Sequence, residues 1–373
     1  MHVPLKMHVP LIDLKQRYLE ERDDILKIID DTLLSGNLVL TPEIKDFEED
    51  VCSYVDSRNC VTLNSGTDAI MMALWVMGIG KGDEVITSPI SFVATIGAIV
   101  HVGAKPVFVD VGNDLNINPD LIEEKITKNT KAIMPVHWTG RVCDMNRIIN
   151  IAKKYNIKII EDSAQSMGAY WNNKHGGTFG DIGIYSAHPL KNFNAIGDSG
   201  FLVTNNSDYA DKINIYKNHG LVSRDNVEIF GVNSRMDTIN SQILKYRLTR
   251  LDDIIKRRRK NVNLYRENLN IDQVVITPCK YEEYNSFVMF IVLCEDRDNL
   301  QKFLKNANID SLIYYSKALH KHKAYIDKFG NHKDLVNSEN LTKKVLALPV
   351  HQHLNEEQIL FVCNKIKEFY NQE

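Results

Sequence analysis

The sequence predicts an α/β fold, in which a large domain with a mostly parallel sheet precedes a smaller α+β domain. From about residue 60, short apolar runs alternate with helical stretches, the pattern of buried strands joined by helical crossovers. A long helical stretch over residues 236–268 ends this region, and a different pattern follows it. We place the boundary near residue 250, which gives domains of residues 7–250 and 251–373.

Hydrophobic periodicity defines the elements of the large domain. Residues 60–64 are expected to form the first strand and residues 67–77 the first helix, which carries apolar side chains at helical spacing. Further strands are expected at residues 84–87, 106–111, 132–136, 157–160, 182–186 and 201–204, with helices at 120–126 and 147–154.

The smaller domain is expected to mix strands and helices. Apolar runs at residues 274–276, 287–293 and 312–315 are the candidates for extended segments. A helical pattern over residues 356–370 closes the chain.

Composition disfavours several classes of function. The chain has 45 Lys and Arg against 48 Asp and Glu, and a net charge of −3 gives no reason to expect binding to nucleic acid or an anionic membrane. Its one basic run, residues 256–260, is interpreted as the solvated face of a helix. No signal peptide is visible and no apolar run approaches the roughly 18–20 residues of a membrane span, so we expect a cytoplasmic protein.

The six cysteines contain no CxxC pair and no histidine placed to complete a zinc site, so reduced thiols and no bound metal are expected. Residues 1–6 are nearly repeated by the residues that follow. We interpret them as a duplicated start or cloning remnant and exclude them from the fold.

The motif Asn64-Ser65-Gly66-Thr67-Asp68 joins the first expected strand to the first helix. Gly66 lets a ligand approach the backbone, and a helix N-terminus offers unpaired N–H groups that suit a phosphate. Ser65 and Thr67 add hydroxyl donors, although for this motif alone capping of the helix by either side chain is the simpler interpretation. The motif is neither a P-loop nor GxGxxG, which disfavours those nucleotide sites.

Asp162 and Lys191 are the strongest candidates for chemistry. Asp162 follows the apolar strand 157–160, where α/β sheets open their binding crevice. Lys191 follows the strand 182–186 and precedes a glycine-rich turn. A lysine and an acid at such positions fit the Schiff-base lysine and pyridinium-binding carboxylate of pyridoxal phosphate (PLP) chemistry. The simpler interpretations are a surface lysine and an N-cap or salt-bridged aspartate.

Two neighbouring side chains fit the same hypothesis. Gln165, three residues beyond Asp162, can donate to a ring oxygen. Phe92 follows the strand 84–87 and can stack on a flat ring, the alternative being ordinary core packing.

Several segments spread over nearly the whole chain carry a family resemblance. They are Pro10 to Leu14, Asn64 to Ala69, Glu161 to Gln165, Ser186 to Lys191, Gly197 to Gly200, Asn218-His219-Gly220, Gly231 to Asp237, Ala318-Leu319-His320 and Leu348 to His351. In order and spacing this set resembles the DegT/DnrJ/EryC1/StrS family of PLP-dependent sugar aminotransferases. Ser-Gly-Thr alone would be a weak signal, whereas the ordered set is specific.

The resemblance implies an aspartate-aminotransferase-like fold (PLP fold type I) and a homodimer with active sites at the subunit interface. It implies that Lys191 forms the internal aldimine, that Asp162 pairs with the pyridine nitrogen and that Gln165 contacts the ring hydroxyl. It further implies the positions that hold the remaining parts of the cofactor. These are Gly66, Thr67 and Ser186 at the phosphate, Phe92 on the ring, and Asn233 at the phosphate of the neighbouring subunit's cofactor.

The chain departs from the family pattern at two positions. Ala187 stands where an aromatic residue is common before the histidine, and Ser199 replaces a glycine of the glycine-rich turn. Neither departure removes a catalytic group, but both are expected to change local packing.

The resemblance implies that the enzyme moves an amino group from glutamate to a keto group of a nucleotide-linked keto-deoxysugar. Residues 231–237 and 314–320 are more similar to members that aminate C3 of 3-keto-6-deoxyhexoses than to those that aminate C4. A sugar diphosphate needs cationic donors, so Arg224, Lys317 and His320 are candidate contacts, the alternative being that each faces solvent.

Other functions remain as alternatives. PLP-dependent sugar dehydratases of the same family carry histidine at the lysine position, and Lys191 argues against that activity. A non-catalytic ligand-binding protein on the same fold stays open. An NAD-dependent oxidoreductase would need a glycine fingerprint that the sequence lacks.

Overall fold

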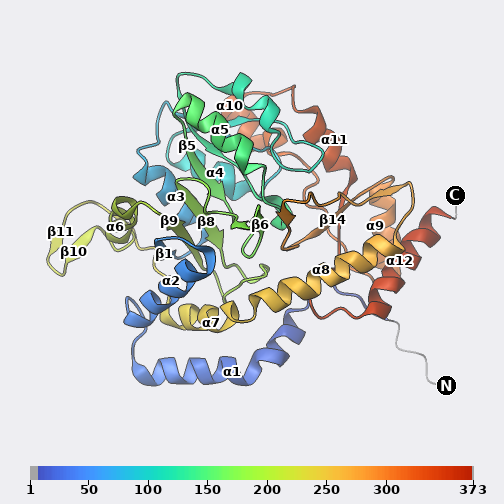
Figure 1. Ribbon diagram of the computed structural model, residues 1–373, viewed down its shortest axis with the longest axis horizontal. Helices are drawn as coiled ribbons and strands as arrows, with labels where there is room; N and C mark the ends of the chain where they lie inside the picture. Colours follow the sequence, from blue (N-terminus) through green and yellow to red (C-terminus); the bar gives the residue numbers. More distant parts are fainter. Residues whose placement is uncertain (1–6, 372–373) are drawn as a thin grey trace.

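A seven-stranded sheet forms the centre of the computed structural model, which describes residues 7–371 (Figure 1). The duplicated start at residues 1–6 lies outside the described residues. The strand order is β1 (Asn59–Leu63), β9 (Gly200–Thr204), β8 (Ile182–Ser186), β5 (Lys158–Asp162), β4 (Thr130–Met134), β2 (Glu84–Thr87) and β3 (Lys105–Phe108). Strands β3, β2, β4, β5 and β8 run parallel, and β9 is antiparallel to both β8 and β1. The prediction of a mostly parallel sheet is confirmed.

Helices cover both faces of this sheet because successive strand residues point to opposite sides. Val85 packs with α3 (Gly66–Val76), α4 (Val93–His101) and α6 (Ser207–Tyr216), whereas Ile86 packs on the side of α5 (Met145–Tyr155). Near β1 and β9 the second face is covered by α2 (Pro42–Val55) and α7 (Thr238–Leu248). Because β1, β2, β4, β5 and β8 run in the same direction, their carboxyl ends lie at one edge of the sheet.

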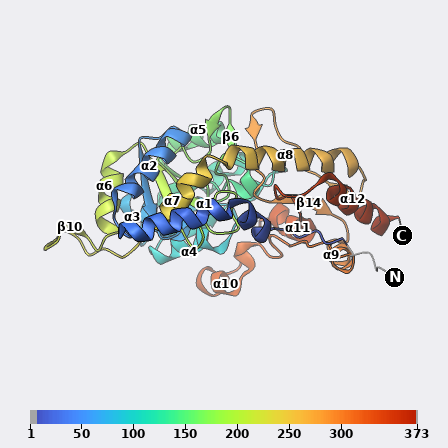
Figure 2. The ribbon, with the colours of Figure 1, turned by 90° about the horizontal axis from the view of Figure 1, so that it is seen from below.

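The helical stretch predicted over residues 236–268 is two helices, so its continuity was wrong. Helix α7 ends at Leu248 and α8 (Leu251–Asn268) begins three residues later. The Thr249 hydroxyl donates to the Tyr246 carbonyl at 2.8 Å, a local bond of the kind that bends or ends helices. Helix α1 (Leu14–Ser35) lies along α7 on the outside of the molecule (Figures 1 and 2).

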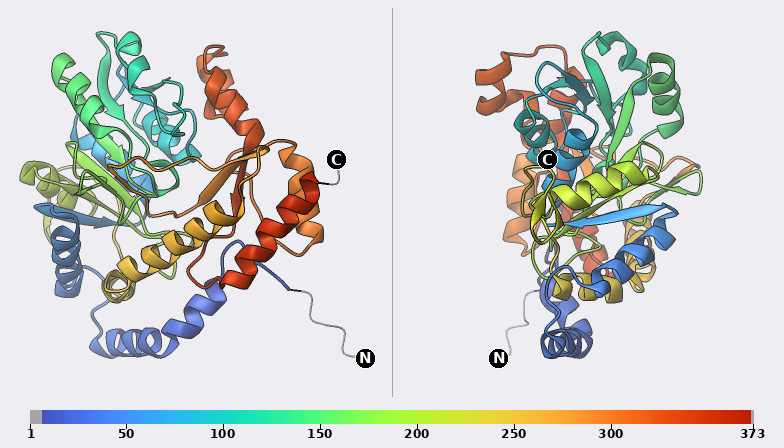
Figure 3. Two further views of the ribbon diagram at one scale, coloured as in Figure 1. Left: turned by 45° about the vertical axis from the view of Figure 1, so that its right-hand side comes forward. Right: turned by 90° about the vertical axis from the view of Figure 1, so that its left-hand side faces the viewer.

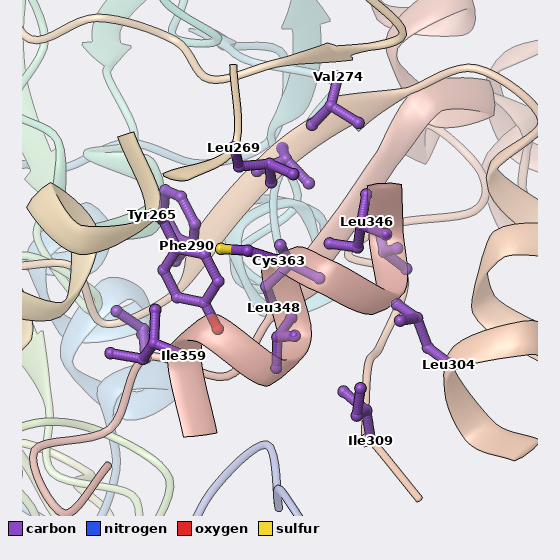
Figure 4. Close-up of a cluster of buried hydrophobic side chains, with 14 of the residues drawn as sticks. Tyr265, Leu269, Val274, Phe290, Leu304, Ile309, Leu346, Leu348, Ile359 and Cys363 are labelled. Atoms are coloured by element: carbon purple, nitrogen blue, oxygen red, sulfur yellow. The ribbon is translucent and has the colours of Figure 1, made fainter. Parts of the chain in front are cut away.

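The C-terminal part is built on a three-stranded antiparallel sheet, in the order β12 (Val274–Val275), β14 (Phe290–Cys294) and β15 (Val345–Leu348). Helices α8, α9 (Arg297–Asn306) and α12 (Glu356–Tyr370) enclose a core with this sheet, part of which is drawn in Figure 4. Helix α12 has its predicted bounds and begins with a capping box of Asn355 and Gln358. The division of the chain at residue 250 stays a prediction.

Shorter elements connect these parts. Helices α10 (Lys323–Phe329) and α11 (Val336–Lys344) lie between β14 and β15 in the chain and form an arm beside the large sheet (Figure 3). The β10 (Leu221–Ser223) and β11 (Asn226–Val227) hairpin extends away from the body at the left of Figure 1. Strands β13 (Glu283–Tyr284), β6 (Tyr170–Trp171) and β7 (Lys174–His175) form a small sheet.

Two expected elements are replaced by irregular structure. Residues 120–126 form the 3₁₀ turns η1 (Pro119–Leu121) and η2 (Glu123–Lys125), because the segment is short and only Ile122 in it is fully buried. Residues 312–315 contribute a single bridge, between Leu312 and Ala347, and no strand. The remaining 3₁₀ turns are η3 (Trp138–Gly140) and η4 (Leu319–Lys321).

The six cysteines are free thiols. Among residues 7–371, no helix has both the length and the apolar character to cross a bilayer. The same residues contain no cluster of three or more His, Cys, Asp or Glu side chains suited to a metal ion.

Candidate active site

A cavity of about 430 Å³ opens at the carboxyl edge of the large sheet. Its walls come from the turn between β1 and α3, the ends of β5 and β8, the start of α4, and strands β14 and β15 of the C-terminal sheet. This is the position where α/β sheets bind ligands, and the volume suits one small organic molecule. The cavity contains both Asp162 and Lys191.

Asp162 is the last residue of β5, and its carboxylate is 4% exposed. It accepts hydrogen bonds from the Thr95 hydroxyl at 2.7 Å and from the Ala164 N–H at 3.2 Å. Burial raises the pKa of this carboxyl, while the Thr95 bond, the Ala164 bond and the charge of Lys191 oppose that shift. A cation inside the cavity would stabilise the ionised carboxylate.

Lys191 lies in the turn that follows β8, where its N–H bonds to the His188 carbonyl at 2.9 Å. Burial lowers the pKa of its amine to about 8, against the charge of Asp162, which raises it. A buried amine with a lowered pKa is a better nucleophile at neutral pH than a surface lysine. Lys191 is half-buried and lines the cavity, which does not fit an ordinary exposed surface lysine.

The segment after Lys191 is held by two buried arginines. Arg17 of α1 donates to the Asn192 carbonyl at 3.0 Å, and Arg247 of α7 donates to the Asn194 carbonyl at 2.7 Å. Both guanidinium groups also bond to Glu21, at 3.3 and 2.7 Å. This network joins two helices to the loop that carries the lysine, and it restricts where the amine can lie.

A second buried network supports Asp162 from behind. Its neighbour Glu161 accepts from His137 Nε2 at 2.8 Å and from the backbone N–H groups of Gly177, Phe179 and Gly180 at 2.8, 2.6 and 2.7 Å. Glu161 and His137 are both completely buried. The carboxylate therefore fixes the end of β5 against a neighbouring loop.

The β1–α3 turn forms a cradle of hydroxyl and N–H groups. Ser65 caps α3 by accepting from the Asp68 N–H at 3.1 Å, and it also lines the cavity with Gly66, Thr67 and Ser186. A Cβ added at Gly66 would lie 2.9 Å from the Ser186 Cβ, closer than carbon atoms pack. The two alternatives for Ser65, capping and lining a ligand site, are thus compatible.

Phe92 and Gln165 also line the cavity. Phe92 is the residue before α4 and is 57% exposed, so it is not a core side chain. The Gln165 side-chain oxygen accepts from the Thr139 N–H at 2.8 Å, which leaves its NH₂ group as the donor for a ligand.

Four predicted site residues lie outside this cavity. Asn233 is exposed and accepts from Arg235 Nε at 2.9 Å, and Arg224 is exposed within the β10–β11 hairpin. Lys317 is exposed, whereas His320 is completely buried and bonds to Glu339 at 3.1 Å. The structure does not bring these residues to the cavity of their own chain.

One cavity residue was assigned elsewhere from the sequence. Arg258 of α8 lines the cavity and is 6% exposed, although the basic run around it was interpreted as a solvated helix face. That interpretation is wrong at this position, because one residue of the run turns toward the core between α8 and the C-terminal sheet. Helical periodicity from Leu251, Ile254 and Ile255 to position 258 was the available signal.

The residues present fit PLP. A buried amine, a buried carboxylate and an open α3 N-terminus that has room for a phosphate are found in one cavity. An added side chain at Gly66 would close the space over that N-terminus. Fold and cavity together define the class: a PLP-dependent enzyme.

Comparison with known proteins gives the particular family. Residues 19–367 match the family model described as the DegT/DnrJ/EryC1/StrS aminotransferase family, and the chain belongs to it. The protein is thus an aminotransferase of a family that depends on PLP.

Several known proteins are similar to this chain over nearly its full length. A "pleiotropic regulatory protein" of Geobacillus stearothermophilus is 36% identical over 98% of this chain and 99% of its own. The dTDP-3-amino-3,6-dideoxy-alpha-D-galactopyranose transaminase of Aneurinibacillus thermoaerophilus is 36% identical over 97% and 99%. The structure of Streptomyces venezuelae DesV with a ketimine intermediate aligns with a TM-score of 0.94 at 32% identity, over 97% and 98% of the two chains.

Proposed function

We propose that this enzyme moves an amino group from glutamate to the keto group of a nucleotide-linked keto-deoxysugar, at C3 of a 3-keto-6-deoxyhexose. The observation that carries the proposal is the buried pair of Lys191 and Asp162 in one cavity. The C3 position is supported by the Aneurinibacillus relative, whose name specifies a 3-amino sugar. Amination at C4 is the alternative within the same reaction.

Each residue has a defined task in this proposal. The cofactor supplies an aldehyde carbon and a ring that accepts electrons. Lys191 would hold the cofactor through its amine and, when that amine is free, would accept and return the proton of the reacting carbon. Asp162 keeps a proton on the pyridine nitrogen. A pKa of about 8 suits Lys191 to both accept and release a proton near neutral pH.

The phosphate would be bound by Ser65, Gly66, Thr67 and Ser186, through hydroxyl groups and the N–H groups of the α3 N-terminus. Phe92 would pack on the ring and the NH₂ group of Gln165 would donate to the ring hydroxyl.

A homodimer with shared active sites is part of the proposal. Asn233 is assigned to the phosphate of the partner's cofactor, and the exposed Arg224 and Lys317 to the sugar diphosphate. His320, which is completely buried and bonded to Glu339, does not fit the contact expected of it. Phe230, which follows the hairpin and is 97% exposed, is an apolar side chain that a second subunit would cover. Light scattering of the purified protein tests this assembly.

Spectroscopy tests the reaction. The protein with PLP is expected to show a yellow absorbance band that glutamate replaces by the band of the pyridoxamine form. Candidate keto sugars can then be ranked by how fast they restore the yellow form. Lys191→Ala is expected to abolish turnover, and a variant that retained normal turnover would refute the assignment.

A regulatory, non-catalytic function is the second candidate, because the Geobacillus relative is named as a regulator. It predicts ligand binding without amino transfer. Failure of glutamate and other amino acids to change the spectrum of the PLP-loaded protein would favour this alternative.

A further inference from the structure

Arg258 is a buried cation within a basic run whose other members are exposed or, at Arg259, half-buried. Its neighbours Lys256 and Arg257 are exposed, and Arg257 pairs with Asp253 at 2.7 Å on the surface of α8. The Arg258 side chain instead points between α8 and the C-terminal sheet. Arg257 and Arg258 are thus adjacent side chains of the same type, one exposed and one buried, and Arg257 can serve as the control for Arg258.

The guanidinium of Arg258 is bound by neutral oxygens. Nη1 donates to the carbonyls of Phe287 and Val288 at 3.1 and 3.3 Å, and Nε and Nη2 donate to the Gln352 side-chain oxygen at 3.3 and 3.1 Å. A guanidinium has five N–H donors, so these four bonds leave one, on Nη2. Within residues 7–371, no carboxylate lies within 4.0 Å of it.

Such a charge is costly without an anion. Burial and the nearby charge of Arg17 lower the pKa of Arg258 to about 9, so the group still carries its charge at neutral pH. The cost of burying an ion is ordinarily offset by a counter-ion. The missing partner is therefore expected to be a ligand.

Arg258 lines the cavity on the wall formed by the C-terminal sheet, beside Val288, Phe290 and Leu348. Phe290 and Leu348 also belong to the hydrophobic cluster drawn in Figure 4, so the arginine lies beside apolar side chains that lower the local dielectric. The cavity lining contains one other Lys or Arg, Lys191. Since Lys191 would hold the cofactor, Arg258 is the remaining Lys or Arg side chain in the lining of this cavity that could meet a substrate.

We propose that Arg258 binds a carboxylate of the amino donor. The inference rests on the proposed function, and it deepens it by assigning the donor's subsite. The cofactor phosphate has its own cradle at the α3 N-terminus, on a different wall. An amino acid must place its Cα at the cofactor, and a charged, planar donor on the cavity wall would fix its carboxylate there.

Binding of glutarate, a dicarboxylate that has no amine and cannot react, tests this subsite directly. Calorimetry on the PLP-loaded protein would compare the wild type with Arg258→Gln, Arg258→Lys and the surface control Arg257→Gln. Glutamine keeps two N–H donors without the charge, whereas lysine keeps the charge. We expect glutarate to bind at least about 30-fold more weakly to Arg258→Gln, less than about tenfold more weakly to Arg258→Lys, and unchanged to Arg257→Gln.

Kinetics give a second measurement. Arg258→Gln should raise the glutamate concentration that half-converts the yellow form by a similar factor, while the keto sugar should restore that form at nearly the wild-type rate. Glutarate affinity that is equal in wild type and Arg258→Gln would overturn the proposal. Equal losses of glutarate affinity in Arg258→Gln and Arg258→Lys would also overturn it. The same holds if Arg258→Gln loses affinity for a nucleoside diphosphate and keeps its affinity for glutarate. Should Arg258→Gln not fold, Arg258→Met keeps an apolar side chain of similar length and removes the charge, and wild-type glutarate affinity in that variant would overturn the proposal. A wild type inert toward glutamate would instead refute the proposed function.

Discussion

Capture of the cofactor by Lys191 should depend on pH in a way that the burial of its amine dictates. The neutral amine is the nucleophile, and burial lowers its pKa from 10.5 to about 8. At pH 7 about 10% of the amine is then neutral, against about 0.03% for an ordinary lysine, so the reactive fraction is about 300-fold larger. The rate of loading should rise with pH and level off above about 8.

Replacement of Asp162 gives a second test of the pH dependence of cofactor loading. Its negative charge raises the pKa of Lys191, so Asp162→Asn should lower that pKa further and move the midpoint of the loading curve to lower pH. The same substitution should slow amino transfer strongly, because the pyridine nitrogen loses the group that keeps it protonated. Faster loading at low pH would thus accompany weaker catalysis.

Stopped-flow absorbance of the yellow band, after mixing cofactor-free protein with PLP across a series of pH values, measures the loading rate. Lys191→Ala is the blank, since it should give no yellow band. A wild-type rate still rising near the ordinary pKa of lysine would refute the reasoning about burial. A midpoint that moved to higher pH in Asp162→Asn would refute the assigned charge interaction.

Three further predictions concern the supports of the site. Gly66→Ala places a Cβ 2.9 Å from that of Ser186 and should cost about 1–3 kcal/mol of cofactor binding, seen as at least about a fivefold higher Kd for PLP in a fluorescence titration. Thr95→Val removes a hydrogen bond that lowers the pKa of Asp162, so the acid limb of the plot of kcat against pH should move to higher pH. The loss of kcat should disappear at alkaline pH, where Asp162 is ionised in both proteins. Glu161→Gln should reduce the unfolding free energy by about 3 kcal/mol or more in urea, because an amide faces three N–H donors and a histidine; an unchanged midpoint would contradict this role.

The sequence predicted the elements whose signals are local. Strands β2 and β8 and helix α12 have the predicted bounds, because each combines a continuous or periodic apolar pattern with clear ends. The 3₁₀ turns at residues 119–125 and the break between α7 and α8 were missed. In both cases short side-chain and backbone bonds override a helical pattern, and such bonds leave no periodic trace.

The site was predictable where its residues lie at strand ends. Asp162, Gln165, Ser186 and the β1–α3 turn meet because carboxyl ends of parallel strands share one edge, a rule that needs no tertiary detail. The supporting networks were not predictable in this way. Glu161 depends on N–H groups some 18 residues away in the chain, and Arg17 and Arg247 meet through Glu21 across two helices.

Arg258 shows most clearly what sequence reasoning lacks. In the sequence it is one of five consecutive basic residues, and its helical spacing from Leu251, Ile254 and Ile255 is the one signal that distinguishes it from Arg257. The packing of α8 against the C-terminal sheet separates the two, leaving one paired with Asp253 on the surface and the other buried without an acid. Burying an unpaired charge destabilises the fold. When such a charge lines a cavity, its presence points to a function in binding. The contrast between these two arginines is therefore the sharpest test of how the enzyme selects its amino donor.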